Sequence, residues 1–469
     1  MGKILGAYLM PHPPVIIPDV GKGQEQKIEK TIKALNKMGE DIAEKKPHTI
    51  ILISPHGAFF KDAISIMGIS TLKGDLSRFG AKNVKIEKEN NLDFVKELDG
   101  EAWEQGVPTV LLDEERIRDY KLNTDLDHGA VVPLYFVEKV YKPYQLVHIN
   151  YGMIPREEQY HFGKIIAESL AFTSNDAVII ASGDLSHKLT PDAPAGYHPS
   201  GQQFDKTIIK LIQEGDVEGI FSLEDSIVTE AGECGLSSID IMLGAFDGWR
   251  ISTDVLSYEG PFGVGYGTAI IQPVEKDQNR LFLDCLKKKS DEKILLIRER
   301  EDPLVRLARR ALEAYVNEQI TIDLPSYTQE DLKTKKAGVF VSIKKDGQLR
   351  GCIGTTQPVE NNIGKEIIRN SIHSGTQDPR FYPVDRDELE QLVYSVDVLG
   401  EPEEIFSKEE LDVKKYGVIV EKGFRKGLLL PNLEGVETIE DQLNIALKKA
   451  NITKDEKYKM YRFKVERHK

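Results

Sequence analysis

The chain has 469 residues, a formal net charge of −14 at pH 7 and a sequence pI near 5.4. This length exceeds one ordinary hydrophobic core and predicts two or three domains. A composition of 40% hydrophobic and 29% charged residues is typical of a soluble globular protein. The acidic balance argues against a bulk nucleic-acid binder, and no apolar run approaches the length that spans a bilayer. Neither nucleic acid nor a membrane is therefore expected as a partner.

The cysteines and the N-terminus indicate the cellular compartment of the protein. The three cysteines, Cys234, Cys285 and Cys352, are scattered and lack CxxC spacing, so neither a disulfide framework nor a thiolate zinc site is expected. Met1 to Ile4 run straight into an apolar segment without a signal-peptide cleavage pattern. These features predict a protein of the reducing cytoplasm, and an oligomer is compatible with them.

The first half of the chain alternates apolar runs with amphipathic segments, which predicts an α/β domain with a mostly parallel central sheet. In chain order, the expected strands are 4–10, 49–53, 64–69, 83–87, 108–112, 144–150, 177–181 and 263–272. The expected helices are 24–45, 94–106, one that begins after an Asp127 N-cap, 157–172, 201–213 and 237–246, with a loop over 188–200. The weaker strands 64–69 and 83–87 are expected to extend the sheet.

A charged segment, 276–302, is predicted to link a first domain, 1–275, to a second domain, 303–469. The pattern of the second domain is typical of an α+β fold. Its expected elements are helices 303–317, 363–374 and 439–450, hairpin strands 338–343 and 349–354 around Lys345-Asp346-Gly347, strand 392–399, hairpin 418–430 and strand 458–465.

Histidines follow three predicted strands of the first domain. They are His12 after 4–10, His56 after 49–53 and His187 after 177–181. Because ligands gather outside the carboxyl ends of parallel strands, these side chains can meet in one pocket. A fourth candidate is His128, in Asp127-His128-Gly129, at the start of an apolar segment.

This set of residues suits a divalent transition metal. Two histidines and a carboxylate on one face of the ion, with open positions opposite, form the site of non-haem Fe(II) oxygenases. We expect His12 and His56 to bind such a metal, with the third ligand within residues 230–234. His187 and His128 would remain unligated in the pocket, where a histidine can take a proton or stabilise bound oxygen.

Four motifs in order, Pro11-His12-Pro13-Pro14, Ser54-Pro55-His56-Gly57, Asp127-His128-Gly129 and Ser182-Gly183-Asp184-Leu185-Ser186-His187, resemble the class III extradiol ring-cleavage dioxygenase family. This family comprises the LigB-type catalytic subunit and its relatives, including the Memo-like proteins, and the likeness covers residues 1–274. It implies that His12, His56 and a glutamate bind Fe2+ and that His187 acts as a base. It also implies that His128 contacts O2 or a small aromatic substrate, a catechol-type diol whose ring is cleaved beside the diol.

The position of the third ligand departs from the family pattern. Glu233 and Cys234 both occupy it, with Glu230 just before, and in Memo-like proteins a cysteine replaces the glutamate. Adjacent residues of extended chain face opposite ways, so one of the two should point inward. We expect Glu233, because Fe(II) prefers a carboxylate, whereas Cys234 would favour Zn2+ or Cu+. His198, in the loop beside the pocket, is expected to contact the substrate.

Further motifs in the second domain are Leu349-Arg350-Gly351-Cys352-Ile353-Gly354, Asp378-Pro379-Arg380-Phe381 and Gly427-Leu428-Leu429-Leu430-Pro431. They resemble the AMME-syndrome candidate family, also called AmmeMemoRadiSam system protein A. The resemblance implies a radical SAM protein as a partner, because bacterial members accompany one. Arg350 and Cys352 share one face of a strand, so the guanidinium could favour a reactive thiolate. The alternative is that Cys352 is a buried small hydrophobe.

Together these observations predict a dioxygenase-like oxidoreductase domain that uses non-haem Fe(II), fused to an AMME-candidate domain. Two alternatives remain. One is a catalytically silent, Memo-like metal-binding scaffold, and the other is a component of an AmmeMemoRadiSam modification system.

Overall fold

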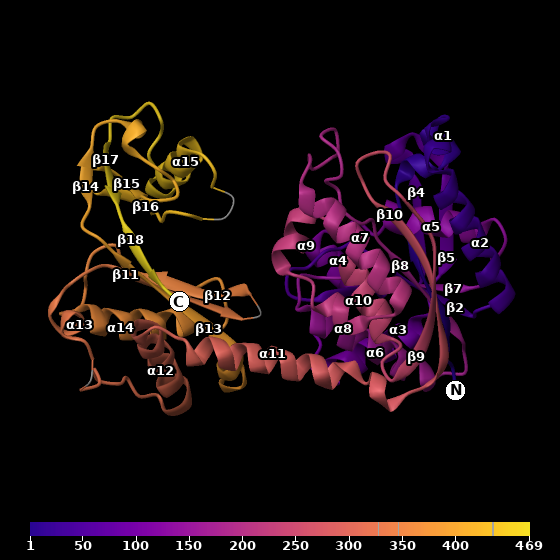
Figure 1. Cartoon of the computed structure of the whole chain (residues 1–469), viewed down its shortest axis with the longest axis horizontal. Helices are drawn as coiled ribbons and strands as arrows, with labels where there is room; N and C mark the ends of the chain where they lie inside the picture. Colours follow the sequence, from indigo (N-terminus) through magenta and orange to yellow (C-terminus); the bar gives the residue numbers. More distant parts are fainter. Residues whose placement is uncertain (327, 346, 434–435) are drawn as a thin grey trace. The chain divides into compact units, whose positions relative to one another are not determined.

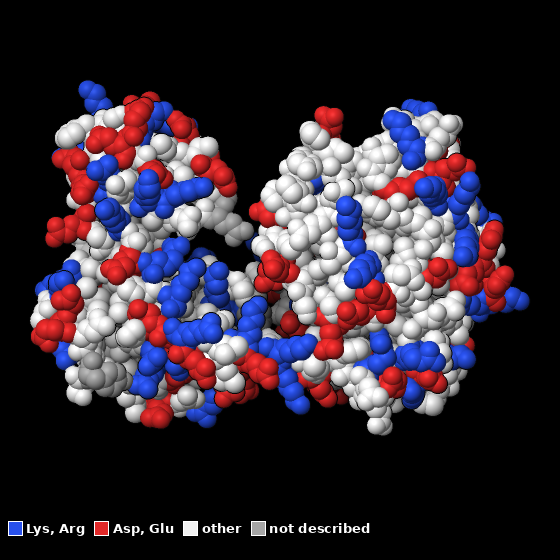
Figure 2. Space-filling view, viewed as in Figure 1, with Lys and Arg blue, Asp and Glu red and all other residues white. Residues whose placement is uncertain are grey.

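The computed structural model describes residues 1–326, 328–345, 347–433 and 436–469. The chain divides into two compact units, Met1–Lys288 and Lys289–Lys469, each with hydrophobic cores of its own (Figure 1). On the face seen in Figure 2, acidic and basic side chains are interspersed over each unit. None of the described helices combines the length and apolar character needed to span a bilayer.

The first unit is built on an eight-stranded sheet of order β6-β3-β7-β2-β8-β1-β10-β9. The strands are β1 (Ile4–Met10), β2 (Thr49–Ser54), β3 (Ile64–Met67), β6 (Thr109–Leu112), β7 (Gln145–Asn150), β8 (Ala177–Ser182), β9 (Trp249–Glu259) and β10 (Tyr266–Lys276). The central strands β7, β2, β8 and β1 are parallel, while β10 and β9 add antiparallel at one edge. The predicted α/β class is confirmed.

Helices cover both faces of this sheet (Figure 1). They are α1 (Pro18–Gly21), α2 (Glu29–Lys45), α3 (Leu92–Glu104), α4 (Glu114–Tyr120), α5 (His128–Glu138), α6 (Arg156–Ala171), α7 (Pro199–Glu214), α8 (Val217–Phe221), α9 (Asp225–Ala231) and α10 (Leu236–Gly244). The core on one face joins α3, α6, α7 and α10, and the core on the other joins α2 and α5. Side chains of β2 alternate between the two cores, which explains why this strand is apolar throughout.

The sheet order brings the predicted histidine-bearing loops to one edge. β2, β8 and β1 are neighbours, and the register pairs Met10 with Ser182 and Ile53 with Ala181. The three strands therefore end at the same level, and the chain segments that carry His12, His56 and His187 leave the sheet side by side.

Two features of the first unit differ from the expectation. Residues 83–87 do not extend the central sheet, because they belong to β5 (Ala81–Glu89), which pairs with β4 (Thr71–Leu76) in a separate two-stranded sheet. Only one side of β5 is buried, so it packs as a surface hairpin. The strand β9 was not predicted, since its half-exposed side chains give it no continuous apolar run.

The second unit has two antiparallel four-stranded sheets, as expected for an α+β fold. One has the order β12-β11-β13-β18 and the other β14-β17-β15-β16. Their strands are β11 (Val339–Lys345), β12 (Gln348–Gly354), β13 (Leu392–Leu399), β14 (Glu403–Ile405), β15 (Gly417–Lys422), β16 (Arg425–Leu429), β17 (Lys459–Phe463) and β18 (Val465–His468). Asp346, in the predicted turn between β11 and β12, lies outside the described residues.

The helices of the second unit are α12 (Pro303–Glu318), α13 (Glu330–Thr334), α14 (Ile363–Thr376) and α15 (Ile439–Ala450). α12 and α14 pack on the first sheet, and α15 packs on the second. Within the segment expected as a linker, the chain forms α11 (Phe282–Glu299). Near the end of α11, Arg298 donates a hydrogen bond to the carbonyl of Leu389, and Glu301 pairs with Arg309.

We predict that the two units fold separately, because each has its own core. A fragment of residues 289–469 should be soluble and unfold cooperatively. A fragment of residues 302–469 lacks Arg298 and Glu301, so its free energy of unfolding should be lower by about 1–3 kcal/mol. Urea unfolding followed by circular dichroism measures both values. Aggregation of 289–469 together with aggregation of 1–288 would contradict separate folding.

Candidate metal centre

Three histidines meet where β1 and β2 end and α5 begins. The ring nitrogens of His12, His56 and His128 that could bind a metal all lie within 4.8 Å of one another. Nε2 of His12 is 3.0 Å from Nε2 of His56. His12 is almost fully buried. Imidazole nitrogens this close to one another are potential donors for a metal ion.

The hydrogen bonds of His12 define which of its nitrogens carries the lone pair. The hydroxyl of Ser182 donates to the carbonyl of Gly129 at 2.5 Å, so its oxygen accepts from Nδ1 of His12 at 2.9 Å. Nδ1 therefore holds the ring proton, and Nε2 presents its lone pair toward His56. This tautomer is the one that a metal bound at Nε2 requires.

Ring orientation separates His128 from the other two histidines. His56 and His128 are stacked, with centroids 4.4 Å apart and planes inclined by 17°, whereas His12 stands nearly perpendicular to His56 at 87°. The lone pair of an imidazole lies in the ring plane, so two stacked rings do not readily aim at one ion. The geometry thus favours His12 and His56 as a ligand pair, with His128 as their stacked neighbour.

Cys234 reaches this cluster from the loop before α10. Its Sγ lies 3.8 Å from Nε2 of His12 and 3.7 Å from Nε2 of His187. The loop can come so close because Gly183 and Gly235 pack backbone against backbone. A Cβ at Gly183 would lie 2.3 Å from Cα of Gly235. Glycine at both positions is therefore a condition for bringing Cys234 to the histidines.

The structure differs from the expectation for the third ligand. The carboxylate of Glu233 accepts a hydrogen bond of 2.6 Å from the backbone N–H of Leu236, at the start of α10. An unpaired helix N-terminus attracts a carboxylate. The Glu233 side chain therefore turns away from the histidines, whereas the Cys234 side chain faces them. Glu230 is half exposed and lies 3.5 Å from Nε2 of His198. His198 itself caps α7 and accepts from the N–H of Ser200 at 3.3 Å.

Two acidic residues that the sequence analysis did not assign to the site lie beside the histidine cluster. Asp127 accepts from Ser54 at 2.6 Å, and its other oxygen is 3.3 Å from Nε2 of His148. Asp184 accepts from the N–H of His12 at 2.9 Å. Asp127 and Asp184 stand inside two of the motifs quoted for the resemblance, which was the available signal. His148 had no signal, since it lies within β7.

Burial governs the protonation of the site. It lowers the pKa of His12, His56 and His187, and lowers that of His128 to about 4, so these imidazoles are neutral at pH 7. Burial also raises the pKa of the Cys234 thiol and raises the pKa of Asp184 to about 7. For Asp127, burial would raise the pKa, but contacts from His148 and Ser54 outweigh it and lower the pKa.

Comparison with known proteins shows the family of each domain. Residues 6–269 match the family described as the catalytic LigB subunit of aromatic ring-opening dioxygenase. The chain belongs to the LigB family. Residues 305–468 match the AMMECR1 family, so the LigB domain is followed by an AMMECR1 domain.

Similar proteins occur in bacteria and archaea. A protein of Clostridium acetobutylicum is 45% identical over 99% of both chains. One of Thermotoga maritima is 50% identical over 171 residues, which are 36% of this chain and 98% of the relative. The crystal structure of an uncharacterized protein from Pyrococcus horikoshii covers 35% of this chain and 88% of its own, with 37% identity and a TM-score of 0.33.

A pocket of about 800 Å³ opens onto the histidines of the LigB domain. His56 and His128 contribute to its lining, together with Phe59 and Phe79. The ring of Phe79 lies 5.2 Å from that of His128. The volume is within the range of pockets that hold small molecules. The β4–β5 hairpin forms another wall of this pocket.

In the AMMECR1 domain, the motif residues Arg350 and Cys352 lie on β12. The guanidinium of Arg350 is engaged by Glu388 through two hydrogen bonds of 2.8 Å. Cys352 instead accepts from the hydroxyl of Ser342 at 3.3 Å, and its backbone N–H donates to Asp378 at 2.9 Å. The guanidinium of Arg350 is therefore paired with a carboxylate, while the Cys352 side chain has a hydroxyl as its partner.

We predict that Ser182→Ala weakens metal binding, because His12 loses the partner that holds its tautomer. Removing such an outer partner typically costs about 10–100-fold in metal affinity. Anaerobic titration with Co2+, followed by absorbance, measures the change. Ser371→Ala is the matched control, since this buried hydroxyl donates to Ala308 in the AMMECR1 domain. Equal affinity in wild type and Ser182→Ala would refute the role of Ser182.

A second prediction concerns the contact between Gly183 and Gly235. Gly183→Ala should lower the free energy of unfolding by roughly 1–3 kcal/mol, because the new methyl group meets backbone that cannot rotate away. Gly100→Ala is the contrasting control. This exposed glycine lies within α3, and a Cβ there meets nothing within 4 Å. It should raise the stability by about 1 kcal/mol. Chemical denaturation gives both numbers.

Proposed function

We propose that the LigB domain is a metal-dependent, dioxygenase-like oxidoreductase whose substrate is a small catechol-type aromatic. The single observation that carries the proposal is the approach of Nε2 of His12 to within 3.0 Å of Nε2 of His56, beside the thiol of Cys234. Neutral imidazoles so close would be stabilised by a shared cation. Their lowered pKa values leave the lone pairs available at pH 7.

The donor set of this chain fits a transition metal, with His12, His56 and Cys234 as the ligands we infer. Fe2+ is the metal that the family relationship favours, and its chemistry when bound would be the activation of O2 toward an electron-rich diol. A thiolate would also stabilise Zn2+ or Cu+. Metal binding would release the thiol proton of Cys234, because burial otherwise keeps this group protonated.

The residues around the inferred ligands suit an aromatic diol. His187 lies beside Cys234, with its Nε2 3.7 Å from Sγ, and burial lowers its pKa, so the neutral ring could accept a proton from a substrate hydroxyl. His128, stacked on His56, would contact O2 or the substrate rather than the metal. Phe59 and Phe79 give the pocket aromatic walls that can pack against a ring.

A second candidate function is favoured by the absence of a carboxylate from the inferred ligand set. If Cys234 and not Glu233 binds the metal, the LigB domain can be a metal-binding scaffold without ring cleavage, as in the Memo-like alternative. A modification system with a radical SAM protein is compatible with this reading. Oxygen uptake with a panel of catechols, after anaerobic loading with Fe2+, separates the two functions. Uptake supports the oxidoreductase, and full metal loading without uptake supports the scaffold.

We predict that Cys234→Ala loses most of its bound metal, whereas Glu233→Ala keeps it, because the Glu233 carboxylate binds the N–H of Leu236. Metal content after anaerobic dialysis is the measurement. Cys285→Ala is the matched control, since it removes another half-buried free cysteine. The reverse pattern, with metal lost only in Glu233→Ala, would replace the inferred ligand by the carboxylate.

We also predict that His187→Ala keeps nearly all its metal while turnover falls by about 10²–10⁴-fold, the usual contribution of a general base. His48→Ala serves as the control, because His48 lies just before β2, at the opposite end of that strand from the cluster, and contacts Thr49. Loss of metal from His187→Ala would show that His187 is a ligand.

A further inference from the structure

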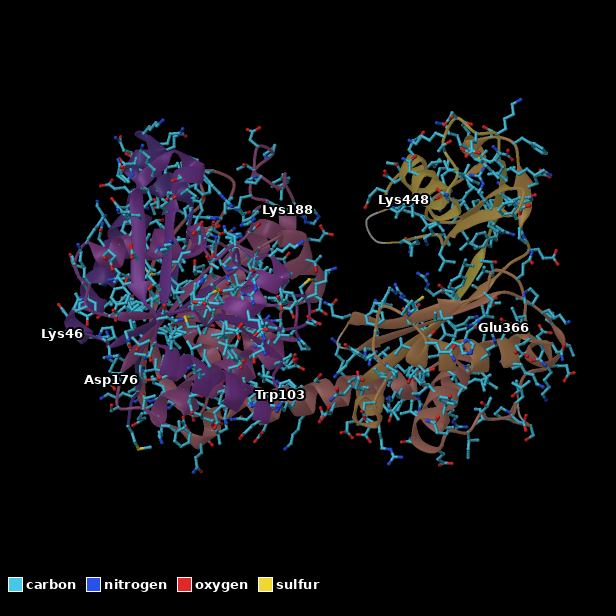
Figure 3. All side chains as sticks on the ribbon, turned by 180° about the vertical axis from the view of Figure 1, so that it is seen from behind. Lys46, Trp103, Asp176, Lys188, Glu366 and Lys448 are labelled. Atoms are coloured by element: carbon cyan, nitrogen blue, oxygen red, sulfur yellow. The ribbon has the colours of Figure 1, made fainter. Side chains whose placement is uncertain are left out.

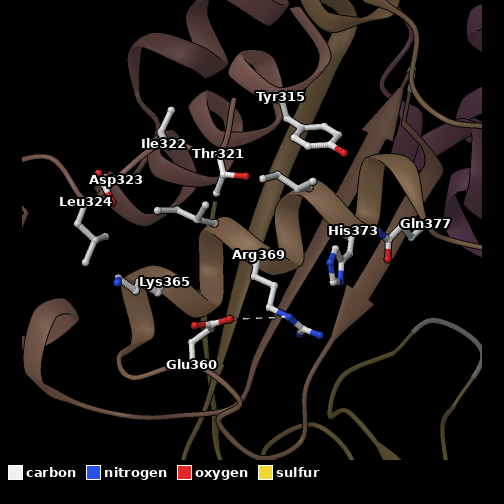
Figure 4. A pocket seen from close by; sticks show the side chains of 12 residues that line it. Tyr315, Thr321, Ile322, Asp323, Leu324, Glu360, Lys365, Arg369, His373 and Gln377 are labelled. Atoms are coloured by element: carbon white, nitrogen blue, oxygen red, sulfur yellow. Dashed lines mark ion pairs between the residues drawn. The ribbon is translucent and has the colours of Figure 1, made fainter. Parts of the chain in front are cut away.

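The AMMECR1 domain contains a cavity of about 350 Å³ that is separate from the histidine cluster. One wall is α14, and the other is formed by Tyr315 near the end of α12 and by residues 321–324 (Figure 4). The side chains of Lys365, Arg369 and His373 follow one another along α14 in this view. The volume falls within the range of small-molecule sites.

The local sequence explains why a cavity forms here. α12 ends at Glu318 and is followed by its C-cap Gln319, whose left-handed φ of 58° stops the helix. The next segment passes beside α14, where Leu324 meets Gly364 closely. A Cβ at Gly364 would lie 2.4 Å from Cδ2 of Leu324. Tyr315, residues 321–324 and α14 together line the cavity.

The α14 wall combines an apolar base with a basic stripe. Ile368 and Ile372 are nearly completely buried and supply the apolar surface. Lys365, Arg369 and His373 recur at intervals of four residues, which places them on one side of the helix. Lys365 and Arg369 carry positive charge, whereas burial and the charge of Arg369 lower the pKa of His373, so this ring is a neutral hydrogen-bonding group. Two cations beside apolar surface suit a ligand with an anionic group and an apolar body.

The acidic neighbour of Arg369 leaves its guanidinium accessible to such a ligand. Glu360 lies 3.9 Å from Nε of Arg369, beyond hydrogen-bonding distance, and both side chains are about one-third exposed. A partly solvated pair of this kind is weak. Glu360 is held in place through its backbone N–H, which donates at 2.7 Å to the buried carboxylate of Glu366. Glu366 lies on α14 and is labelled in Figure 3. An anion can therefore compete for Arg369 without unfolding the wall.

We propose that this cavity binds a small organic anion. Its carboxylate or phosphate group pairs with Arg369 and Lys365, because a guanidinium binds both groups in a bidentate manner. Its apolar or aromatic body lies against Tyr315, Ile368 and Ile372. The site is independent of the metal centre of the LigB domain, and the binding of its ligand needs no metal.

The test uses the full, metal-free chain and fluorine NMR with three probes of similar shape. They are para-trifluoromethylbenzoate, para-trifluoromethylphenyl phosphate and the neutral para-trifluoromethylbenzyl alcohol. At least one of the two anions should bind, and at least tenfold more tightly than the alcohol. The tighter of the two identifies a carboxylate or a phosphate as the natural group. Hydrogen exchange should slow in residues 312–325 and 360–377 when that anion is added.

Three variants test whether the anion binds in this cavity. Arg369→Gln should weaken binding of the anion by about tenfold or more, as expected for loss of a charge-assisted contact. Thr321→Trp keeps every charge but fills the exposed rim of the cavity, and should also weaken binding. Lys448→Gln, which removes an exposed charge on α15, should leave binding unchanged. Thermal unfolding confirms that each variant is folded.

The proposal is overturned if neither anion binds, or if the alcohol binds as tightly as the anions. It is also overturned if Arg369→Gln and Thr321→Trp both bind the anion like the wild type. Loss of binding in His56→Ala alone would place the anion in the LigB domain, and this outcome too would refute the second site. None of these results depends on metal loading or oxygen uptake. They therefore test the anion site separately from the proposed function of the LigB domain.

Discussion

The hydroxyl of Ser182 connects three elements around the histidine cluster. It belongs to β8, accepts from His12 after β1 and donates to Gly129 in α5. One buried oxygen thereby determines the tautomer of His12 and the position of the helix that carries His128. The parallel alignment of β2, β8 and β1 makes this possible, because it ends the three strands at one level. The remaining geometry of the site depends on this short chain of hydrogen bonds.

The choice between a carboxylate and a thiol at the third position follows from helix electrostatics. Glu233 and Cys234 are adjacent, and the backbone N–H of Leu236 at the start of α10 donates to the Glu233 carboxyl group, although burial raises the pKa of this group to about 7. The neutral thiol is then directed to the histidines, where burial raises its pKa. Chemical preference of the metal for oxygen was the basis for expecting Glu233. That argument omitted the backbone N–H of Leu236, which binds the Glu233 carboxyl group and leaves Cys234 facing the histidines.

Much of the fold could be predicted from the sequence, because the strands of a parallel sheet are continuous apolar runs. β1, β2 and β8 were evident for this reason, and their histidines followed from the topology. β9 and the separate pairing of β5 were not, since half-exposed strands carry weak patterns and pairing partners are distant in sequence. The sequence alone also does not indicate the tertiary contacts of buried polar residues. His148 meets Asp127 only because β7 lies beside β2.

The β4–β5 hairpin gives the LigB domain a modular construction. It contributes Lys73 and Lys85 to the large pocket, yet it forms a sheet of its own that is not paired with the central one. Substitutions or insertions in this hairpin would thus alter one wall of the pocket while the strands that carry the histidines keep their register. Its exposed outer residues could therefore diverge among relatives while the histidines stay in place. Its inner residues are more constrained, because the N–H of Leu126, two residues before His128, donates to the carbonyl of Lys73 at 2.7 Å.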